Sequence, residues 1–299
     1  MTSSSSDFQE YDPSTYWVAP ARNFRTSARL HLQHLLFQNT LGHLLEPHVE
    51  SSIKGSKHLK VADLGCGNGV WLSDLAHELS KKGISAQLDG YDVNPVNFPA
   101  PTFLPSSINL KKLDVLARHL PAEMIGAYDI VHVRAFVSII VNSDPTDFLS
   151  TALALLKPGG WLQWEESRAD HYFVESPTPD VSKSACETII HMLKTGGEAR
   201  GFKFDFLAEL DQHLTKHGFQ DVSMQTVDKR RQDLKAWTED YLMVWEELGV
   251  LFPPKATAPQ APLSRESWVD LFGRAVKETE DGVVVSQGNI VSVVGRKAT

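Results

Sequence analysis

The fold can be inferred first from residues 61–69, which read Val-Ala-Asp-Leu-Gly-Cys-Gly-Asn-Gly. The segment begins as a buried strand and ends in a glycine-rich turn, and residues 70–76 continue with apolar positions at helical spacing. Glycine allows φ > 0 and a close approach of the backbone to a ligand. A strand, a tight turn and a helix start therefore predict a nucleotide site. The alternative is a tight turn that binds nothing.

The spacing of the glycines indicates which nucleotide is bound. A dinucleotide-binding loop follows G-x-G-x-x-G, whereas the third glycine here comes one residue early, at Gly69, and Val70 follows it. Asp63 precedes the first glycine by two residues. The pattern D-x-G-x-G-x-G resembles motif I of class I S-adenosylmethionine (SAM)-dependent methyltransferases. This resemblance implies that the loop binds SAM through Asp63, Gly65, Cys66, Gly67, Asn68 and Gly69.

Composition limits the partners that we expect. The 299 residues suit one large α/β domain with additions, or two small domains. The net charge of −8 and the lack of a basic run argue against a nucleic-acid partner. Two cysteines give no disulfide framework, which favours a reducing, cytoplasmic location. We expect no membrane association, because no apolar run approaches transmembrane length and residues 1–10 lack the apolar core of a signal peptide.

Strand and helix patterns alternate after the glycine loop, which predicts a mostly parallel sheet with helices on both faces. This is the Rossmann-like α/β fold of class I methyltransferases, expected here with an N-terminal helical lid and inserted helices above the substrate pocket. We expect the strands at residues 59–64, 86–91, 108–115, 128–134 and 161–166, and the helices at residues 24–45, 70–81 and 145–156.

Ligands bind at the carboxyl ends of parallel strands, so the residues that follow each strand are the other cofactor candidates. Asp92 would accept hydrogen bonds from the ribose hydroxyls, although it could instead cap a turn before Asn94-Pro95. Asp114 would lie beside the adenine, or it is an N-cap or a loop acid. The cofactor-binding set is completed by Val93, Asn94, Val115, Val133 and Arg134.

Several segments together resemble one group of enzymes, the fungal class I methyltransferases of secondary metabolism. These include the LaeA-like group and the O- and N-methyltransferases of alkaloids and diketopiperazines. The resemblance extends from about Tyr16 to Glu166 and thins out beyond it. The segments that carry it are Tyr16-Trp17, Arg29-Leu30-His31-Leu32-Gln33-His34, Val131-His132-Val133-Arg134 and Leu156-Lys157-Pro158-Gly159-Gly160-Trp161-Leu162-Gln163-Trp164-Glu165-Glu166.

We divide the chain into five parts. A disordered tail (1–15) precedes a helical lid (16–57), whose polar residues could instead be a solvated helix face. The SAM-binding core (58–168) and a helical insertion with a core helix (169–218) follow. Residues 219–299 hold two antiparallel core strands, 219–227 and 288–295, with a helical substrate cap inserted at 232–285. Within the last two parts we expect helices at 178–195, 204–217, 238–248 and 264–278.

Methyl transfer from a sulfonium is an in-line displacement, so the protein mainly has to align the reactants and exclude water. Aromatic faces tolerate a sulfonium by cation–π attraction. The candidates for the aromatic and substrate contacts are Tyr16, Trp17, Phe136, Trp164 and Trp245. The candidates for a general base or for substrate orientation are His34, Glu165 and His171.

We expect no metal, because the side chains of Glu165 and Glu166 point to opposite faces of a strand. The leading hypothesis is a SAM-dependent O-methyltransferase that acts on a small secondary metabolite, such as an alkaloid or a peptide-derived natural product, as a monomer or homodimer. N-methylation of the same substrate class is an alternative, as is a SAM-binding pericyclase or LaeA-like regulator. A nicotinamide dehydrogenase is disfavoured by the early third glycine.

Overall fold

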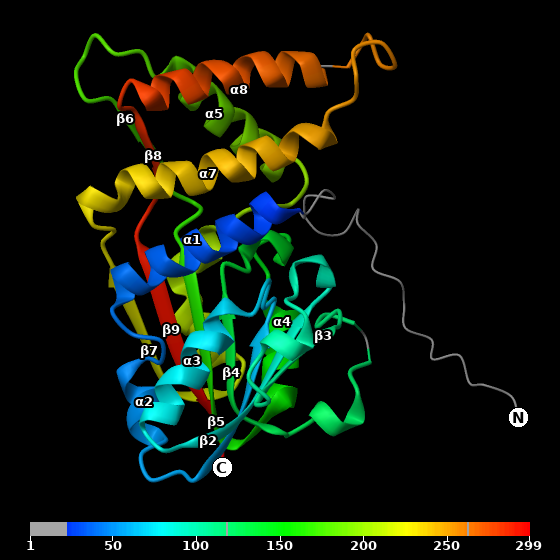
Figure 1. Ribbon diagram of the computed structural model, residues 1–299, viewed down its shortest axis with the longest axis vertical. Coiled ribbons are helices and arrows are strands. Elements are labelled where there is room, and N and C mark those ends of the chain that lie inside the picture. The colour runs from blue at the N-terminus through cyan, green and yellow to red at the C-terminus, as the bar shows by residue number, and fades with distance from the viewer. Residues whose placement is uncertain (1–22, 118, 262) are drawn as a thin grey trace, which may run out of the picture.

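The computed structural model describes residues 23–117, 119–261 and 263–299. The predicted disordered tail, together with Tyr16 and Trp17, lies outside these residues. Figure 1 shows two layers of the molecule: a sheet with its flanking helices below, and a group of helices above it. The helix α1 (Phe24–Leu41) runs between the two layers.

The lower layer is built on a seven-stranded sheet with the strand order β3-β2-β1-β4-β5-β9-β7. β9 lies antiparallel between β5 and β7, while the first five strands are parallel. The Rossmann-like α/β fold is thereby confirmed, as is the antiparallel pairing of the last two core strands. The strands are β1 (His58–Leu64), β2 (Ser85–Asp92), β3 (Ile108–Lys112), β4 (Tyr128–Arg134), β5 (Leu156–Ser167), β7 (Phe219–Val227) and β9 (Ile290–Lys297).

The sheet register brings the polar strand ends together at one edge. Asp63 of β1 pairs with Gly90 of β2 on one side and with His132 of β4 on the other. Arg134, the last residue of β4, pairs with Glu165 of β5. Because these strands are parallel, their carboxyl ends open toward the same side, which in Figure 1 is the side of α1 and the upper helices.

The upper layer consists of helices joined to the core by a small second sheet. This sheet pairs β6 (Tyr172–Glu175) with β8 (Val284–Gln287) in antiparallel fashion. The sequence analysis missed both strands, which are only four residues long. The remaining helices of both layers are α2 (Pro47–Ser52), α3 (Val70–Lys81), α4 (Thr146–Leu155), α5 (Ser184–Glu198), α6 (Leu210–Lys216), α7 (Leu234–Leu248) and α8 (Arg265–Glu280).

The N-terminal helix is shorter than predicted. It ends at Leu41 because Gly42 adopts the left-handed conformation, with φ 79°, and donates its N–H to the Gln38 carbonyl. A separate helix, α2, then begins at Pro47. The single helix predicted over residues 24–45 is therefore wrong in its C-terminal part.

Three other boundaries also differ. β5 begins at Leu156 instead of the predicted residue 161, and the register between β4 and β5 is irregular between Tyr128 and Ile130. β3 ends at Lys112, which leaves Asp114 in the following loop. The helix expected at 204–217 starts as a 3-10 turn before α6.

The start of α5 was also predicted wrongly, and a tertiary contact explains the error. This helix was expected to begin at residue 178, but α5 begins at Ser184. Both oxygens of Glu278, from α8, accept hydrogen bonds at 3.0 Å from the backbone N–H groups of Ala185 and Cys186. These are N–H groups that a helix start leaves without an internal partner. α5 is thus capped by a side chain that lies far away in the sequence.

We predict that Glu278→Ala lowers the free energy of unfolding by ~1–3 kcal/mol, because the start of α5 loses its cap. Burial raises the pKa of Glu278, but the N–H groups of Cys186 and Ala185 outweigh it, and the net pKa is lowered. The contribution should therefore be present at neutral pH and be lost in acid, as the pH falls through the lowered pKa of Glu278. Urea unfolding measures it. Glu280→Ala, an exposed position on the same helix, is the control, and an equal loss in both variants would contradict the capping role.

Candidate active site

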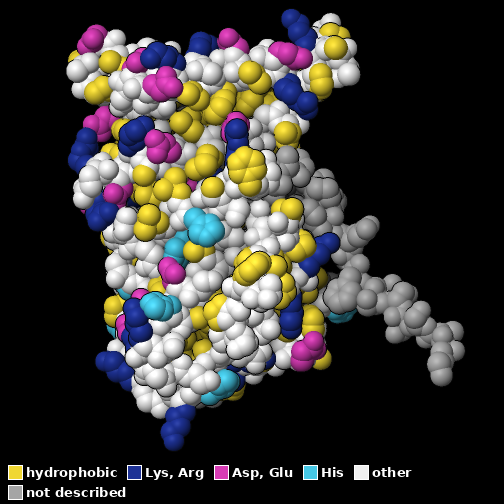
Figure 2. All heavy atoms as spheres, viewed as in Figure 1, with side chains coloured by type: hydrophobic (Ala, Val, Ile, Leu, Met, Phe, Trp, Pro, Cys, Tyr) yellow, Lys and Arg dark blue, Asp and Glu magenta, His cyan; other side chains and the backbone are white. Residues whose placement is uncertain are grey.

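A cavity of about 350 Å³ lies between the carboxyl ends of the parallel strands, α1 and α7. Its lower wall is formed by the glycine loop and by the residues that follow β2, β3 and β4. Its upper wall is formed by one face each of α1 and α7. On the molecular face seen in Figure 2, hydrophobic side chains gather over these upper helices. The cavity therefore joins a polar, loop-lined half to a half that is lined by helices.

The glycine loop is fastened to the end of β2. The backbone N–H groups of Gly65 and Cys66 both donate to the carbonyl of Tyr91, at 2.7 and 3.0 Å. The N–H of Gly67 donates to Asp92 Oδ2 at 3.0 Å. Gly65 and Gly67 have φ of 70° and 59°, which side chains with a Cβ rarely adopt. The loop conformation thus requires glycine at both positions.

Close packing above the loop is a second reason for its glycines. A Cβ on Gly65 would lie 2.6 Å from the Phe136 ring, and one on Gly67 would lie 2.9 Å from Leu30 Cδ1. α1 also holds the loop through polar contacts, because the Asn68 amide donates to the Ser27 carbonyl at 3.2 Å and to His31 Nδ1 at 2.8 Å. The helix that was predicted to be a lid therefore rests directly on the glycine loop.

The acids at the strand ends fit a nucleoside cofactor. Asp92 is 6% exposed and lines the cavity, and its Oδ1 accepts the N–H of Asn94 at 2.9 Å. Asp114 lines the cavity too, and its Oδ1 accepts the N–H of Leu116 at 2.9 Å. Each acid thus accepts a hydrogen bond within a turn and also lines the cavity. Stabilising a turn and binding the cofactor are therefore compatible roles for both. Carboxylates with remaining acceptor sites suit ribose hydroxyls and an exocyclic amine.

The structure brings most of the predicted cofactor residues to the cavity wall. Those that line it are Asp63, Gly65, Cys66, Gly67, Asn68, Asp92, Val93, Asp114, Val115 and Arg134. The other three, Gly69, Asn94 and Val133, are not part of the lining. Gly69 is the N-cap of α3 with φ 76°, and Val133 is fully buried in the sheet.

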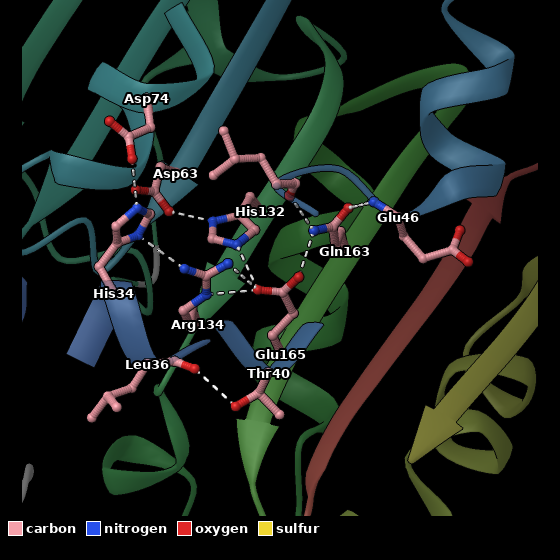
Figure 3. A network of polar contacts seen from close by, with 11 residues as sticks. His34, Leu36, Thr40, Glu46, Asp63, Asp74, His132, Arg134, Gln163 and Glu165 are labelled. Atoms are coloured by element: carbon pink, nitrogen blue, oxygen red, sulfur yellow. Dashed lines mark hydrogen bonds and ion pairs between the residues drawn. The ribbon is translucent and has the colours of Figure 1, made fainter. Parts of the chain in front are cut away.

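A buried polar network runs beneath the cavity, as Figure 3 shows. Glu165 has no exposed surface and forms an ion pair with Arg134, with 2.5 Å between its Oε2 and the Arg134 Nη2. Arg134 Nη1 donates to His34 Nδ1 at 3.0 Å, and His34 Nε2 lies 3.0 Å from Asp74 Oδ2. Strand β5 is thereby connected through β4 to α1 and α3.

A second branch of this network reaches the glycine loop. His132 Nδ1 lies 2.7 Å from Asp63 Oδ1, and the His132 ring stacks on Trp71 with 3.6 Å between the ring centroids. His132 Nε2 lies 3.5 Å from Glu165 Oε2. Asp63, which was predicted only as a cofactor residue, therefore also orients the side chain of its neighbour on β4.

Charge pairing sets the protonation states in this network. Burial would raise the pKa of Glu165, but Arg134 and His132 outweigh it and lower the pKa to about 2. Burial and the adjacent Arg134 charge lower the pKa of His34, despite the opposing effect of Asp74. At neutral pH Glu165 is therefore ionised and His34 is neutral, with its Nδ1 accepting from Arg134.

Among the three candidate catalytic residues, only His34 lines the cavity. Glu165 faces the opposite side of β5 and is occupied by Arg134, while His171 is 68% exposed and lies outside the lining. Among the aromatic candidates, Phe136 and Trp245 line the cavity. Trp164 does not, because it is fully buried and packs against Phe148 and Phe206. Tyr16 and Trp17 lie outside the described residues.

Glu166 faces the cavity where Glu165 does not, as expected for neighbours on a strand. Its Oε1 accepts the indole N–H of Trp164 at 2.9 Å and the backbone N–H of Phe136 at 2.5 Å. Burial nevertheless dominates and raises the pKa of Glu166 to about 8. At neutral pH this carboxyl is mostly protonated, and it holds the loop after β4 in place beside the glycine loop.

From the cavity-facing stripe of α7, only Trp245 was predicted from the sequence. The members of this stripe recur at helical spacing: Trp237, Asp240, Tyr241, Val244, Trp245 and Leu248. α1 contributes a matching stripe of Thr26, Arg29, Leu30, Gln33, His34 and Phe37. The signal available in the sequence was an acid, Asp240, at a position of the helical repeat that is otherwise apolar. Such an acid is buried when the helix packs, and it then needs an explanation.

Two absences hold for the described ranges alone. In residues 23–117, 119–261 and 263–299, no group of three or more His, Cys, Asp or Glu side chains is placed to hold a metal ion. Across the same ranges, no helix combines the length and the apolarity that crossing a bilayer requires.

We predict that Arg134→Met destabilises the protein by ~3–5 kcal/mol, because it leaves the Glu165 carboxylate buried without a counter-charge. Arg134→Met combined with Glu165→Gln should recover much of this loss, since Gln163 can still hydrogen-bond the new amide. Urea unfolding of the two single variants and the double variant gives the coupling energy. Additive losses would show that the two side chains are not coupled.

Residues 30–224, more than half of the chain, match a family model described as a methyltransferase domain. The matched segment includes most of α1, the glycine loop and strands β1 to β5. It therefore contains the whole loop-lined half of the cavity.

Three of the curated relatives, all from fungi, illustrate the similarity. The methyltransferase grgD of a Penicillium species is 32% identical over 209 residues, which cover 68% of both chains. The N-methyltransferase tcpN of Claviceps purpurea is 34% identical, and the alignment covers 49% of this chain and 50% of tcpN. The secondary metabolism regulator LAE1 of Pyricularia oryzae is 28% identical, and the alignment covers 62% of this chain and 57% of LAE1. The chain thus aligns with about half the length of the latter two.

These matches confirm the resemblance to fungal methyltransferases of secondary metabolism that the sequence analysis proposed, and with it SAM as the cofactor. The similarity to grgD covers two thirds of both chains, and the family model contains the loop that was recognised first. The chain belongs to the methyltransferase-domain family and is a SAM-dependent methyltransferase.

Proposed function

We propose that this enzyme transfers a methyl group from SAM to a hydroxyl of a small natural product, such as an alkaloid or a peptide-derived metabolite. The observation that carries the proposal is the two-part cavity. A glycine loop and two strand-end acids form one half, and the aromatic stripe of α7 forms the other. A flat aromatic substrate in the second half would face a cofactor in the first.

Within this proposal the loop-lined half holds SAM. Asp92 accepts the ribose hydroxyls, Asp114 lies beside the adenine, and the Gly65–Gly69 loop lies under the amino-acid portion. When bound, SAM supplies a methyl group on a positively charged sulfur. Phe136, which packs on Gly65, places an aromatic ring beside this half, and its face would attract the positively charged sulfur.

The protein's own contribution is alignment and the exclusion of water. α1 and α7 cover the cavity, and ion pairs join them: Arg29 to Glu247 at 3.4 Å and Arg25 to Glu246 at 2.6 Å. His34 is the proposed base for the acceptor hydroxyl. Its ring is neutral at physiological pH, but Nδ1 has to exchange the Arg134 hydrogen bond for the substrate before it can accept a proton.

N-methylation is the second candidate, and it is favoured by the name of the relative tcpN. The name of LAE1 favours a third possibility, a regulatory role without turnover. Deuterium-labelled SAM separates the three. Incubation with a panel of hydroxylated and aminated alkaloids, followed by mass spectrometry with fragmentation, shows whether the label is transferred and to which atom. SAM binding without any labelled product would overturn the enzymatic proposal.

The remaining expectations belong to the same proposal. We propose a cytoplasmic enzyme that acts as a monomer or homodimer on a small molecule rather than on nucleic acid. The net charge of −8 supports the exclusion of nucleic acid, and the cysteine usage supports a reducing compartment.

We predict that Asp92→Ala weakens SAM binding by about a hundredfold or more, because the ribose hydroxyls lose a charged acceptor. Calorimetry with SAM, and separately with NADPH, measures the effect. Asp147→Ala, at an exposed acid in the first turn of α4, is the control. Unchanged SAM affinity in a folded Asp92→Ala protein would remove the ribose assignment.

We predict that His34→Ala lowers kcat by about 10²–10⁴-fold, the range that is typical of a lost general base. Because burial lowers the pKa of His34, the wild-type kcat should fall only when the pH drops below the ordinary pKa range of histidine, and this decline should be absent from the variant. His171→Ala, which alters an exposed histidine outside the lining, should retain the wild-type profile. Equal turnover of His34→Ala and wild type at every pH would exclude His34 as the base.

A further inference from the structure

Asp240, in the middle of α7, is a buried acid that the mechanism above does not use. Its side chain has no exposed surface and it lines the cavity. The Gln33 side chain of α1 approaches its carboxylate, but neither carboxylate oxygen makes a well-formed hydrogen bond to another described residue. Buried polar groups in proteins are nearly always hydrogen-bonded, so an exception of this kind requires a reason.

The groups around Asp240 compensate its charge only partly. From α1, Arg29 and Gln33 favour its ionised form, but Arg29 is already paired with Glu247. Lys229, in the segment after β7, also acts on it, but the Lys229 Nζ donates to the Tyr241 hydroxyl at 2.9 Å and to the Gln287 carbonyl at 3.2 Å. Each nearby cation is thus engaged elsewhere.

The protonation of these groups follows from burial. Burial raises the pKa of Asp240 to about 6, against the opposing effects of Arg29, Gln33 and Lys229. Burial also lowers the pKa of Lys229 to about 7. Glu247 raises the pKa of Asp240 further. At neutral pH Asp240 is therefore mostly ionised, in a position where ionisation costs free energy unless a partner arrives.

The walls around Asp240 suit a cation. Trp237 lies about one turn before Asp240, Tyr241 directly follows it, and Trp245 lies five residues after it; all three line the same cavity. The indole N–H of Trp237 also has no hydrogen-bond partner among the described residues. Aromatic faces beside a carboxylate attract an ammonium group and gain little from an anion. The Lys229 Nζ already lies 4.1 Å from the centre of the Trp237 ring, as such an attraction predicts. Because Glu247 pairs with Arg29 and burial lowers the pKa of Lys229 to about 7, the charge of Asp240 is only partly balanced.

We infer that Asp240 determines substrate specificity by binding a protonated amine in the aromatic half of the cavity. The inference rests on the proposed function, because it concerns the substrate of that same cavity. A protonated nitrogen has no lone pair to attack the methyl group. The amine held by Asp240 is therefore not the methyl acceptor, and the acceptor is another atom of the same substrate, in agreement with O-methylation.

The binding test uses matched probes on the full-length protein saturated with S-adenosylhomocysteine. Tryptamine carries an ammonium group, and tryptophol carries a hydroxyl at the same position of the same skeleton. By calorimetry at about pH 7.5, the wild type should prefer tryptamine by about tenfold or more. Asp240→Asn should lose this preference, whereas Glu239→Gln, at the exposed neighbouring position on α7, should keep it.

A stability measurement separates this role from a structural one. Because the pKa of Asp240 is raised by folding, wild-type stability contributed by this group is present at low pH and is lost as the pH rises through about 6. Asp240→Asn removes that loss, so at about pH 8 the variant should have a Tm equal to or above that of the wild type. A structural acid would instead lower the Tm when replaced.

The outcomes are distinguishable. Equal binding of the two probes, binding of neither, or a retained preference in Asp240→Asn would overturn the amine site, as would a lower Tm of this variant at about pH 8. Calorimetry with S-adenosylhomocysteine alone tests the proposed function independently. If S-adenosylhomocysteine binds and the amine preference is absent, the methyltransferase proposal stands and only the role of Asp240 fails.

Discussion

The Glu165 carboxylate is buried without any exposed surface, and the arrangement around the cavity depends on how its charge is compensated. Arg134 supplies the compensation from the neighbouring strand, and Gln163 donates to the other carboxylate oxygen at 2.7 Å. A buried ion pair of this kind contributes little net stability, but it strongly disfavours any arrangement that separates its members. It therefore fixes the end of β4 relative to β5, and with it the position at which the chain turns toward the cofactor.

The same pair extends upward into the lid. Arg134 reaches His34 on α1, and α1 in turn rests on the glycine loop through Leu30 and Asn68. From its opposite side α1 pairs with α7 through two ion pairs. α1 thus contacts the sheet, the glycine loop and α7 at the same time. Binding in either half of the cavity acts on the same helix.

Two buried acids show how burial and pairing separate structural from functional roles. Glu165 has a guanidinium at 2.5 Å, and its pKa is lowered to about 2 although it is completely buried. Asp240 is equally buried but lacks a dedicated partner, and its pKa is raised to about 6. The first charge is satisfied within the fold. The Asp240 charge is compensated only when a ligand binds, and its burial lowers the stability of the unliganded protein, as is common in binding sites.

The sequence by itself determined the parts that depend on local pattern. The glycine loop, the α/β alternation, and the bounds of α3, β4 and β7 could be predicted because glycine at positive φ, helical spacing and apolar runs leave direct traces in the chain. Most of the residues predicted to bind the cofactor line the cavity, since parallel strands bring their carboxyl ends together. Only the tertiary structure decided what depends on packing between distant segments. Glu278 caps α5 from another helix, which moved the start of that helix by six residues from Thr178 to Ser184. Glu165 and Glu166 are adjacent and chemically alike, but their partners assign one to an ion pair and the other to the cavity. The burial of Asp240 makes it a candidate binding residue. This burial cannot be read from the sequence, because it arises only when α7 packs over the sheet.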